Sequence, residues 1–175
     1  MTAPVLETDR LILRPHRVQD FDDVAALWAE PEVVRFISGK PSTRRESWSR
    51  LLRYIGHWQA LGYGYWAVTL RDSGRFAGEV GFADFQRDME PPLNGVPEAG
   101  WALHPDLHGQ GLATEAVQHI HTWAEDETGW TETACIFDPA HLASQRIAQK
   151  LGYAPAGEAK FNGAPTLVMK RKIAR

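Results

Sequence analysis

The chain has 175 residues, of which 43% are hydrophobic and 23% are charged, values that are ordinary for a globular protein and exclude a disordered or fibrous chain. The formal net charge of -3 gives no reason to expect nucleic-acid binding, because a surface that follows phosphates normally carries an excess of Lys and Arg. No apolar run approaches the roughly 20 residues that span a bilayer, which excludes a membrane-spanning helix.

The compartment and domain organisation follow from equally simple features. The first ten residues lack the apolar core of a secretory signal, and Cys135 is the single cysteine, so no internal disulfide can form. We therefore expect a cytoplasmic protein that makes no membrane contact. The length suits one domain over residues 1–175, as a monomer or a homodimer.

The first elements of the chain are a strand and a helix. Residues 11–15 predict a strand that ends at Pro15. Asp20 is expected to cap the following helix, and Pro31 is expected to end it.

A second helix is expected from Ser42 or Thr43 to Leu61. Its predicted buried stripe consists of Trp48, Leu51, Leu52, Ile55 and Trp58. The basic stretch from Lys40 to Arg53 is interpreted as a solvated face of this helix.

The rest of the chain alternates strands and helices. Strands are predicted at 65–70, 75–85, 99–103, 131–137, 153–160 and 166–172, and helices at 112–123 and 141–151. The segment 86–97 is rich in Pro, Asn and Gly, so it is expected to be a loop, either functional or a plain surface insertion. The pattern predicts a mixed α/β fold.

The stretch "HPDLHGQGLATEAV" at 104–117 joins a strand directly to a helix. Such a turn exposes the first N–H groups of the helix and its partial positive end, which together can bind an anion. Gly109, Gly111 and Ala113 remove side-chain bulk where a phosphate would approach. The same residues are also compatible with a tight connection that binds nothing. Neither the P-loop nor the dinucleotide-binding glycine pattern fits here.

Four motifs in order resemble the GNAT N-acetyltransferase family, in the branch similar to ribosomal-protein N-terminal acetyltransferases. They are "LETDRLILRP", "EAGWALHPD", "HGQGLATEAV" and "ASQRIAQKLGY". The resemblance implies a mostly antiparallel sheet that is splayed at the acyl-CoA site and flanked by about four helices. It also implies direct transfer of an acetyl group from acetyl-CoA to an amine, without a metal.

The resemblance assigns the acetyl-CoA site to two places. The diphosphate would be held by the backbone of His108, Gly109, Gln110, Gly111, Leu112, Ala113 and Thr114. The oxyanion of the tetrahedral intermediate would be stabilised by a backbone N–H near Leu103 and His104. A metal site from His104 and His108 is not expected, because no further ligand cluster of suitable spacing accompanies them.

The last helix is expected to supply the acid that protonates the departing thiolate. Many family members have Asn and Tyr at the positions that His141 and Ala148 occupy here. Ser144 becomes the candidate to hydrogen-bond or protonate the thiolate, with His141 also placed near the cofactor. Alternatively, Ser144 only satisfies the first N–H groups of its helix. Cys135 is interpreted as a packing residue, and His119 and His121 as surface residues.

Two acidic residues are candidates for the general base. Glu98 begins the strand that leads to the glycine turn, and Glu79 interrupts an apolar strand, where an unpaired buried carboxylate would be costly. The alternative for both is a solvated, outward-facing position.

The motifs do not define the chemical identity of the acceptor. An amine is implied by the resemblance, and peptide N-termini, amino acids, polyamines and aminoglycosides all fit. Acidic residues near the expected cleft would suit a cationic amine: Glu32, Asp84, Asp88 and Glu90. A non-catalytic module that binds acyl-CoA and regulates another protein is the alternative function.

Overall fold

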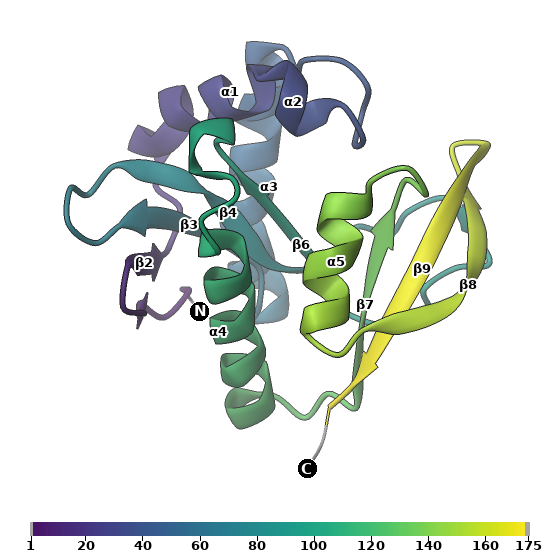
Figure 1. The fold of residues 1–175 in the computed structure, drawn as a ribbon. Helices are drawn as coiled ribbons and strands as arrows, with labels where there is room; N and C mark the ends of the chain where they lie inside the picture. Colours follow the sequence, from purple (N-terminus) through teal and green to yellow (C-terminus); the bar gives the residue numbers. More distant parts are fainter. Residues whose placement is uncertain (1, 174–175) are drawn as a thin grey trace.

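The strands of the protein form one open sheet (Figure 1). The structure is a computed structural model that describes residues 2–173. The strands are β1 (Leu6–Glu7), β2 (Leu11–Arg14), β3 (Tyr65–Leu70), β4 (Phe76–Ala83), β5 (Met89–Glu90), β6 (Glu98–Leu103), β7 (Glu132–Phe137), β8 (Ala154–Phe161) and β9 (Ala164–Lys172). Their order is β1-β2-β3-β4-β6-β7-β9-β8-β5.

The described residues form five α-helices, against the four or so expected. They are α1 (Phe21–Ala29), α2 (Pro31–Val34), α3 (Arg44–Leu61), α4 (Leu112–Glu127) and α5 (Leu142–Lys150). The additional helix is α2, a single turn. Pro31 was expected only to end α1, but it also begins α2, because a proline in the first helical turn sacrifices no intrahelical hydrogen bond.

Helices cover both faces of the sheet. Figure 1 shows α4 and α5 in front of the sheet and α3 behind it, with α1 and α2 at one end. Val80 and Phe82 of β4 pack in the core cluster that includes α4 and α5. Ala67 and Ala102 belong to the cluster formed with α1, α2 and α3. No helix within residues 2–173 has the length and apolar character needed to cross a bilayer.

The sheet is splayed at its centre, as expected. All its strand pairs are antiparallel except β6 and β7, which run parallel and are in register only at Glu98 and Ala134. Beyond that point β6 pairs with β4 alone. The far half of β6, up to Leu103, therefore has one edge open.

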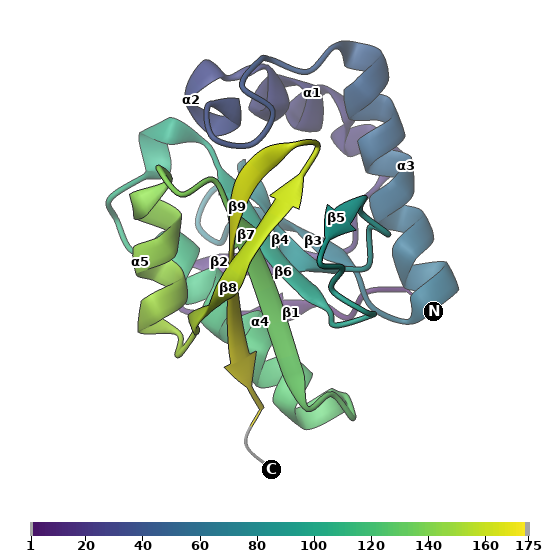
Figure 2. The ribbon, with the colours of Figure 1, turned by 90° about the vertical axis from the view of Figure 1, so that its right-hand side faces the viewer.

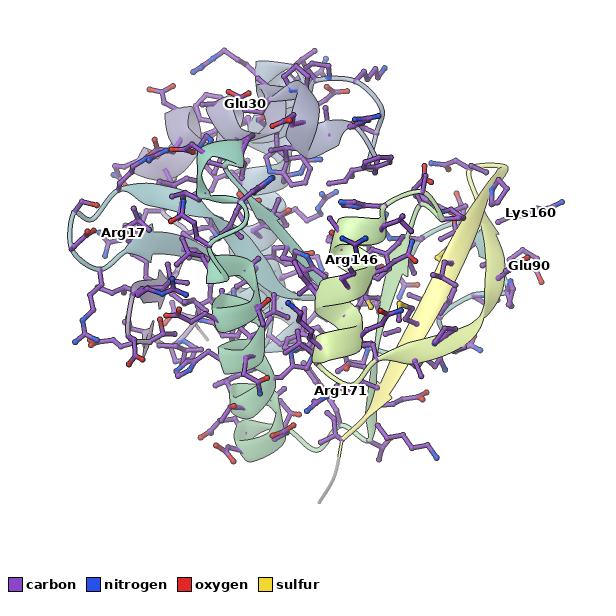
Figure 3. All side chains as sticks on the ribbon, viewed as in Figure 1. Arg17, Glu30, Glu90, Arg146, Lys160 and Arg171 are labelled. Atoms are coloured by element: carbon purple, nitrogen blue, oxygen red, sulfur yellow. The ribbon has the colours of Figure 1, made fainter. Side chains whose placement is uncertain are left out.

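The predicted loop 86–97 contains a short strand. Met89 and Glu90 form β5, which pairs with Phe161 and Lys160 of β8. Glu90 and Lys160 lie near one another at the outer edge of the molecule (Figure 3). The pairing ties this segment to the β8–β9 hairpin.

The apolar stripe predicted for α3 is partly wrong. Leu51 and Trp58 are buried, but Trp48 and Leu52 are 37% and 44% exposed, and Tyr54 is buried instead. The stripe is displaced because α3 packs through the face that carries Tyr54, whose ring stacks on Tyr65 of β3 with centroids 4.5 Å apart. A second correction concerns Asp20. It stands at the N-cap of α1, but its carboxylate accepts hydrogen bonds from Arg14 and from the Arg17 N–H.

His121, which was expected at the surface, is buried on α4. Its Nδ1 lies 2.7 Å from the Val117 carbonyl oxygen, and its Nε2 lies 2.7 Å from the Tyr153 hydroxyl. That hydroxyl is also 2.7 Å from Thr133 Oγ1. The network therefore connects α4 to β7 and to the end of α5. Burial lowers the pKa of His121 to about 4, so the ring is neutral at pH 7.

We predict that this histidine makes the fold sensitive to acid. Between pH 6.5 and 4 the unfolded chain binds a proton at His121 that the folded chain does not, so stability falls as the pH is lowered. The loss over this window is about 3 kcal/mol. Urea unfolding at pH 7 and at pH 4.5 measures it. His121→Gln, which cannot titrate, should show a smaller loss than the wild type, and equal losses would contradict the prediction.

Candidate active site

A cavity of about 310 Å³ lies between the end of β6, the start of α4 and the start of α5. We call it the splay cavity. It is lined by Trp101–Leu103 of β6, by residues 107–109 and 111–114, by His141 and residues 143, 144, 147 and 150 of α5, and by Glu32 and Val33 of α2 with the nearby Ile37. Nine of the predicted cofactor-binding residues line it: Leu103, His108, Gly109, Gly111, Leu112, Ala113, Thr114, His141 and Ser144. Gln110 and His104, which were also predicted, are not among its lining residues.

The glycine turn adopts a backbone that glycine favours. Gly109 and Gly111 have φ angles of 74° and 77°, in the left-handed region that other residues rarely adopt. Gly111 is the N-cap of α4, and it provides no side chain to cap the helix. The first N–H groups of α4 therefore face the cavity side of the turn without a capping side chain. Together with the helix dipole they form a site suited to an anion.

An ion pair that the sequence analysis did not identify supports this turn. Glu115 in the first turn of α4 accepts hydrogen bonds from Thr8 and from the backbone and side chain of Arg10. Arg10 Nη1 also donates to the Gln110 carbonyl oxygen at 2.9 Å. Burial would raise the pKa of Glu115, but these hydrogen bonds outweigh it and lower that pKa. The N-terminal strand region thus holds the glycine turn in place.

Of the two predicted oxyanion donors, the structure leaves one available. The His104 N–H donates to the Ala77 carbonyl oxygen at 2.9 Å, so it is part of the sheet. Backbone groups on neighbouring residues of a strand point in opposite directions, which directs the Leu103 N–H away from β4 and toward the open edge. The Leu103 carbonyl oxygen lies on the same edge, 2.9 Å from His108 Nε2.

Ser144 and His141 form a pair at the start of α5. Ser144 is buried, and its Oγ lies 3.1 Å from His141 Nε2. The His141 ring stacks on Phe36 with centroids 4.8 Å apart. The alternative for Ser144 was that its hydroxyl satisfies the first N–H groups of the helix. Instead, His141 is the N-cap of α5, no side chain caps the helix, and the Ser144 hydroxyl contacts His141. Burial lowers the pKa of His141, which favours its neutral form.

A further polar group beside the cavity is the indole of Trp101. Its Nε1 is buried and has no hydrogen-bond partner among residues 2–173. A buried donor without a partner costs free energy, so this N–H is available to a ligand that carries an acceptor. This role of Trp101 could not be predicted, because a single tryptophan in a strand carries no sequence pattern that marks an unpartnered indole N–H.

Glu98 lies at a second cavity of about 310 Å³, which we call the loop cavity and define by residues 83–89, 92–96 and 98. Its carboxylate accepts two hydrogen bonds from the Arg87 guanidinium, at 2.8 and 2.9 Å. Glu98 is buried, so the outward-facing alternative is wrong for it. Asp84 and Asp88 line the same cavity.

Glu79 is also buried, and the outward-facing alternative is wrong here too. Its carboxylate accepts a hydrogen bond from Trp28 Nε1 at 2.9 Å, and its other oxygen lies 3.3 Å from His16 Nε2. Neither the splay cavity nor the loop cavity includes it. Glu79 therefore joins β4 to the helical layer rather than facing a space that a substrate could enter.

A family model described as an acetyltransferase (GNAT) domain matches residues 10–154. Among curated proteins, "Uncharacterized N-acetyltransferase YoaA" of Bacillus subtilis is 24% identical over 155 residues, which are 88% of this chain and 85% of the relative. The part of the chain that the structure describes contains no cluster of three His, Cys, Asp or Glu suited to a metal ion.

Solved structures share the fold. A GnaT-family acetyltransferase from Bordetella pertussis superimposes with a TM-score of 0.85 at 30% identity, covering 97% of this chain and 99% of that one. RimL, a ribosomal L7/L12 alpha-N-protein acetyltransferase in complex with coenzyme A, superimposes with a TM-score of 0.80 at 16% identity, covering 97% and 98%.

Proposed function

The chain belongs to the GNAT acetyltransferase family, and from this premise we propose that it transfers the acetyl group of acetyl-CoA directly to a primary amine. The observation that carries the proposal is the glycine turn at the uncapped start of α4, which opens onto a cavity whose other wall presents Ser144. We further propose that residues 1–175 act as one domain.

Acetyl-CoA binds, in this proposal, along the splay cavity. The backbone from His108 to Thr114 holds the diphosphate through the bare N–H groups of the turn. His104 and Gln110, which do not line the cavity, contribute through the shape of the turn. The thioester lies near Leu103, whose N–H stabilises the oxyanion.

The transfer needs two proton movements. The neutral amine attacks the thioester carbonyl carbon, the carbonyl oxygen becomes an oxyanion, and the amine loses a proton. Collapse of the intermediate then breaks the carbon–sulfur bond and releases the CoA thiolate. His141 Nε2–H donates a hydrogen bond to Ser144 Oγ, and the Ser144 hydroxyl donates a hydrogen bond to the departing sulfur. The thiolate takes its proton from water, and the base returns the proton of the amine to water.

We assign the base to Glu98 rather than to Glu79. Glu98 lies at the loop cavity, whereas Glu79 is fully buried beneath Trp28 and His16. Glu98 stands five residues before Leu103 on β6, roughly 16 Å at the rise of a strand, so in this proposal the proton reaches it through a relay of several water molecules. Glu79 acts as a positioning residue that fixes β4 beside Ala102.

The enzymatic function is tested by incubating the protein with acetyl-CoA and a panel of peptides and small amines. We expect release of free CoA thiol together with a gain in acceptor mass of one acetyl group. A chain that binds acetyl-CoA but turns over no acceptor would be the non-catalytic module instead. Ala148 at the usual Tyr position favours that alternative, whereas the Ser144–His141 pair favours catalysis.

Ser144→Ala is expected to lower kcat about tenfold while acetyl-CoA affinity stays unchanged. The loss is limited because a thiolate whose conjugate thiol has a pKa near 8.5 leaves without full proton transfer. Thiol release at saturating acetyl-CoA measures it. Ser73→Ala, exposed in the turn between β3 and β4 and outside all three cavities, is the matched control and should keep the wild-type rate. Unchanged turnover in Ser144→Ala would remove the assigned role.

A further inference from the structure

A third cavity, of about 570 Å³, lies along the first half of α3 and carries mostly positive side chains. We call it the basic groove and define it by residues 38, 40–43, 45, 46, 49, 50 and 53. Its charged residues are four cations and one carboxylate: Lys40, Arg45, Arg50, Arg53 and Glu46. The groove therefore has a local charge of about +3, although the whole chain is at -3.

The groove cations outnumber the one carboxylate near them, Glu46, whose pKa is lowered mainly by hydrogen bonds from Thr43 and also by the charges of Lys40 and Arg50. Within residues 2–173, the ion pairs involve none of the four. Glu46 is engaged with Thr43, whose N–H and hydroxyl both donate to it, in the capping box of α3. Arg44, on another side of the helix, is paired with Asp22. The three arginines of α3 that have no ion pair among the described residues, Arg45, Arg50 and Arg53, therefore lie along the groove.

Aromatic rings hold two of the arginines in place without cancelling their charge. The guanidinium carbon of Arg50 lies 3.6 Å from the centroid of the Trp28 ring, and that of Arg53 lies 4.9 Å from the Phe85 ring. Such contacts restrict a long side chain at little electrostatic cost. Arg53 is exposed, as expected for a solvated helix face, and Arg50 is half-buried.

Residues of the groove lie next to residues of both cavities of the proposed active site. Phe85 lies between Arg53 and Arg87, whose guanidinium carbon is 4.7 Å from the same ring, and Arg87 holds Glu98 in the loop cavity. At the other end, Ser38 lines the groove and the preceding Ile37 lines the splay cavity. Figure 2 shows α3 beside β5. Phe85, which Arg53 contacts, lies four residues before β5 begins.

We propose that the acceptor is an acidic polypeptide whose terminal amine passes Glu98 to reach the thioester near Leu103 and whose following residues place carboxylates in the basic groove. The inference rests on the acetyltransferase function proposed above. From Arg45 to Arg53 the helix rises about 12 Å, which matches roughly four residues of extended chain and exceeds a single amino acid. A small acceptor would leave most of the cations unused.

Peptides with the same first residue and acidic, neutral or basic residues at the next five positions test the proposal. We expect kcat/KM for the acidic peptide to exceed that for the neutral peptide at least tenfold, and to fall as salt rises from 0.05 to 0.5 M. Equal rates for the three peptides, or a preference for the basic one, would overturn the inference. An equal rate for free glutamate would also overturn it, because the acceptor would then be a small acid.

Charge-reversed variants locate the effect. Arg45→Glu should lower kcat/KM for the acidic peptide about tenfold and leave that for the neutral peptide unchanged, and Lys40→Glu/Arg45→Glu should lower it further. Arg146→Glu is the matched control, because Arg146 lies exposed on α5, on the side of the sheet opposite α3 (Figure 3). Equal losses in Arg45→Glu and Arg146→Glu would overturn the inference. If no acceptor of any kind releases CoA thiol, the proposed function fails instead.

Discussion

Gly111→Val is expected to raise the dissociation constant for acetyl-CoA at least 100-fold. The φ angle of 77° at this position is costly for any residue with a Cβ and more so for a β-branched one. The two methyl groups would also stand at the N-cap of α4, where the backbone N–H groups are to meet the diphosphate. Isothermal titration of the purified variant with acetyl-CoA measures the change.

A matched control separates loss of the site from loss of the fold. Gly74, in the turn between β3 and β4, has a φ angle of 71°, and a Cβ there would meet no atom within 4 Å. Gly74→Val therefore suffers similar backbone strain, and we expect it to lower the melting temperature while keeping wild-type affinity. Acetyl-CoA affinity within threefold of the wild type in Gly111→Val would contradict the assigned site.

The parts of the site that could be predicted depend on short stretches of chain. The glycine turn is an example, because the left-handed backbone at Gly109 and Gly111 and the helix that follows are local properties. Thr43 was similarly recognisable as a helix start, since its partner Glu46 is three residues away. Local hydrogen bonds leave a local sequence pattern, so they are visible without a structure.

The parts that could not be predicted depend on contacts between distant segments. Arg10 and Glu115 lie 105 residues apart, and His121 and Tyr153 lie 32 apart, so nothing near either residue indicates its partner. The aromatic contacts of the basic groove are hidden for the same reason. Helical spacing shows that Arg50 and Arg53 share a side of α3, but only the fold places Phe85 against that side.

The two candidate bases also differ only in contacts between distant segments. Glu79 interrupts an apolar strand and Glu98 begins one, and the sequence offers no basis for choosing between them. In the fold, Glu79 is covered by Trp28 and His16, whereas Glu98 borders a cavity and is held by Arg87. The choice depends on which neighbouring segment covers each carboxylate.

Glu98→Gln is expected to lower kcat/KM about 100-fold, within the range for loss of a general base. The loss should depend on the acceptor, because an amine must shed its proton before or during attack. An α-amine with a pKa near 8 needs less help than a lysine side chain near 10.4, so we expect the variant to lose more activity with lysine-type acceptors. Initial rates of thiol release with the two classes of amine measure this difference, and acetyl-CoA affinity should stay unchanged.

Arg87→Gln distinguishes this role from a structural one. Either substitution breaks the ion pair between half-buried Arg87 and buried Glu98, so both variants should lose stability. Only Glu98→Gln also removes the proton acceptor. If the pair merely fixes the start of β6, the two variants will lose activity alike and without regard to the pKa of the amine. If Glu98 receives the proton, Arg87→Gln will keep most of its activity, and the dependence on amine pKa will appear in Glu98→Gln alone.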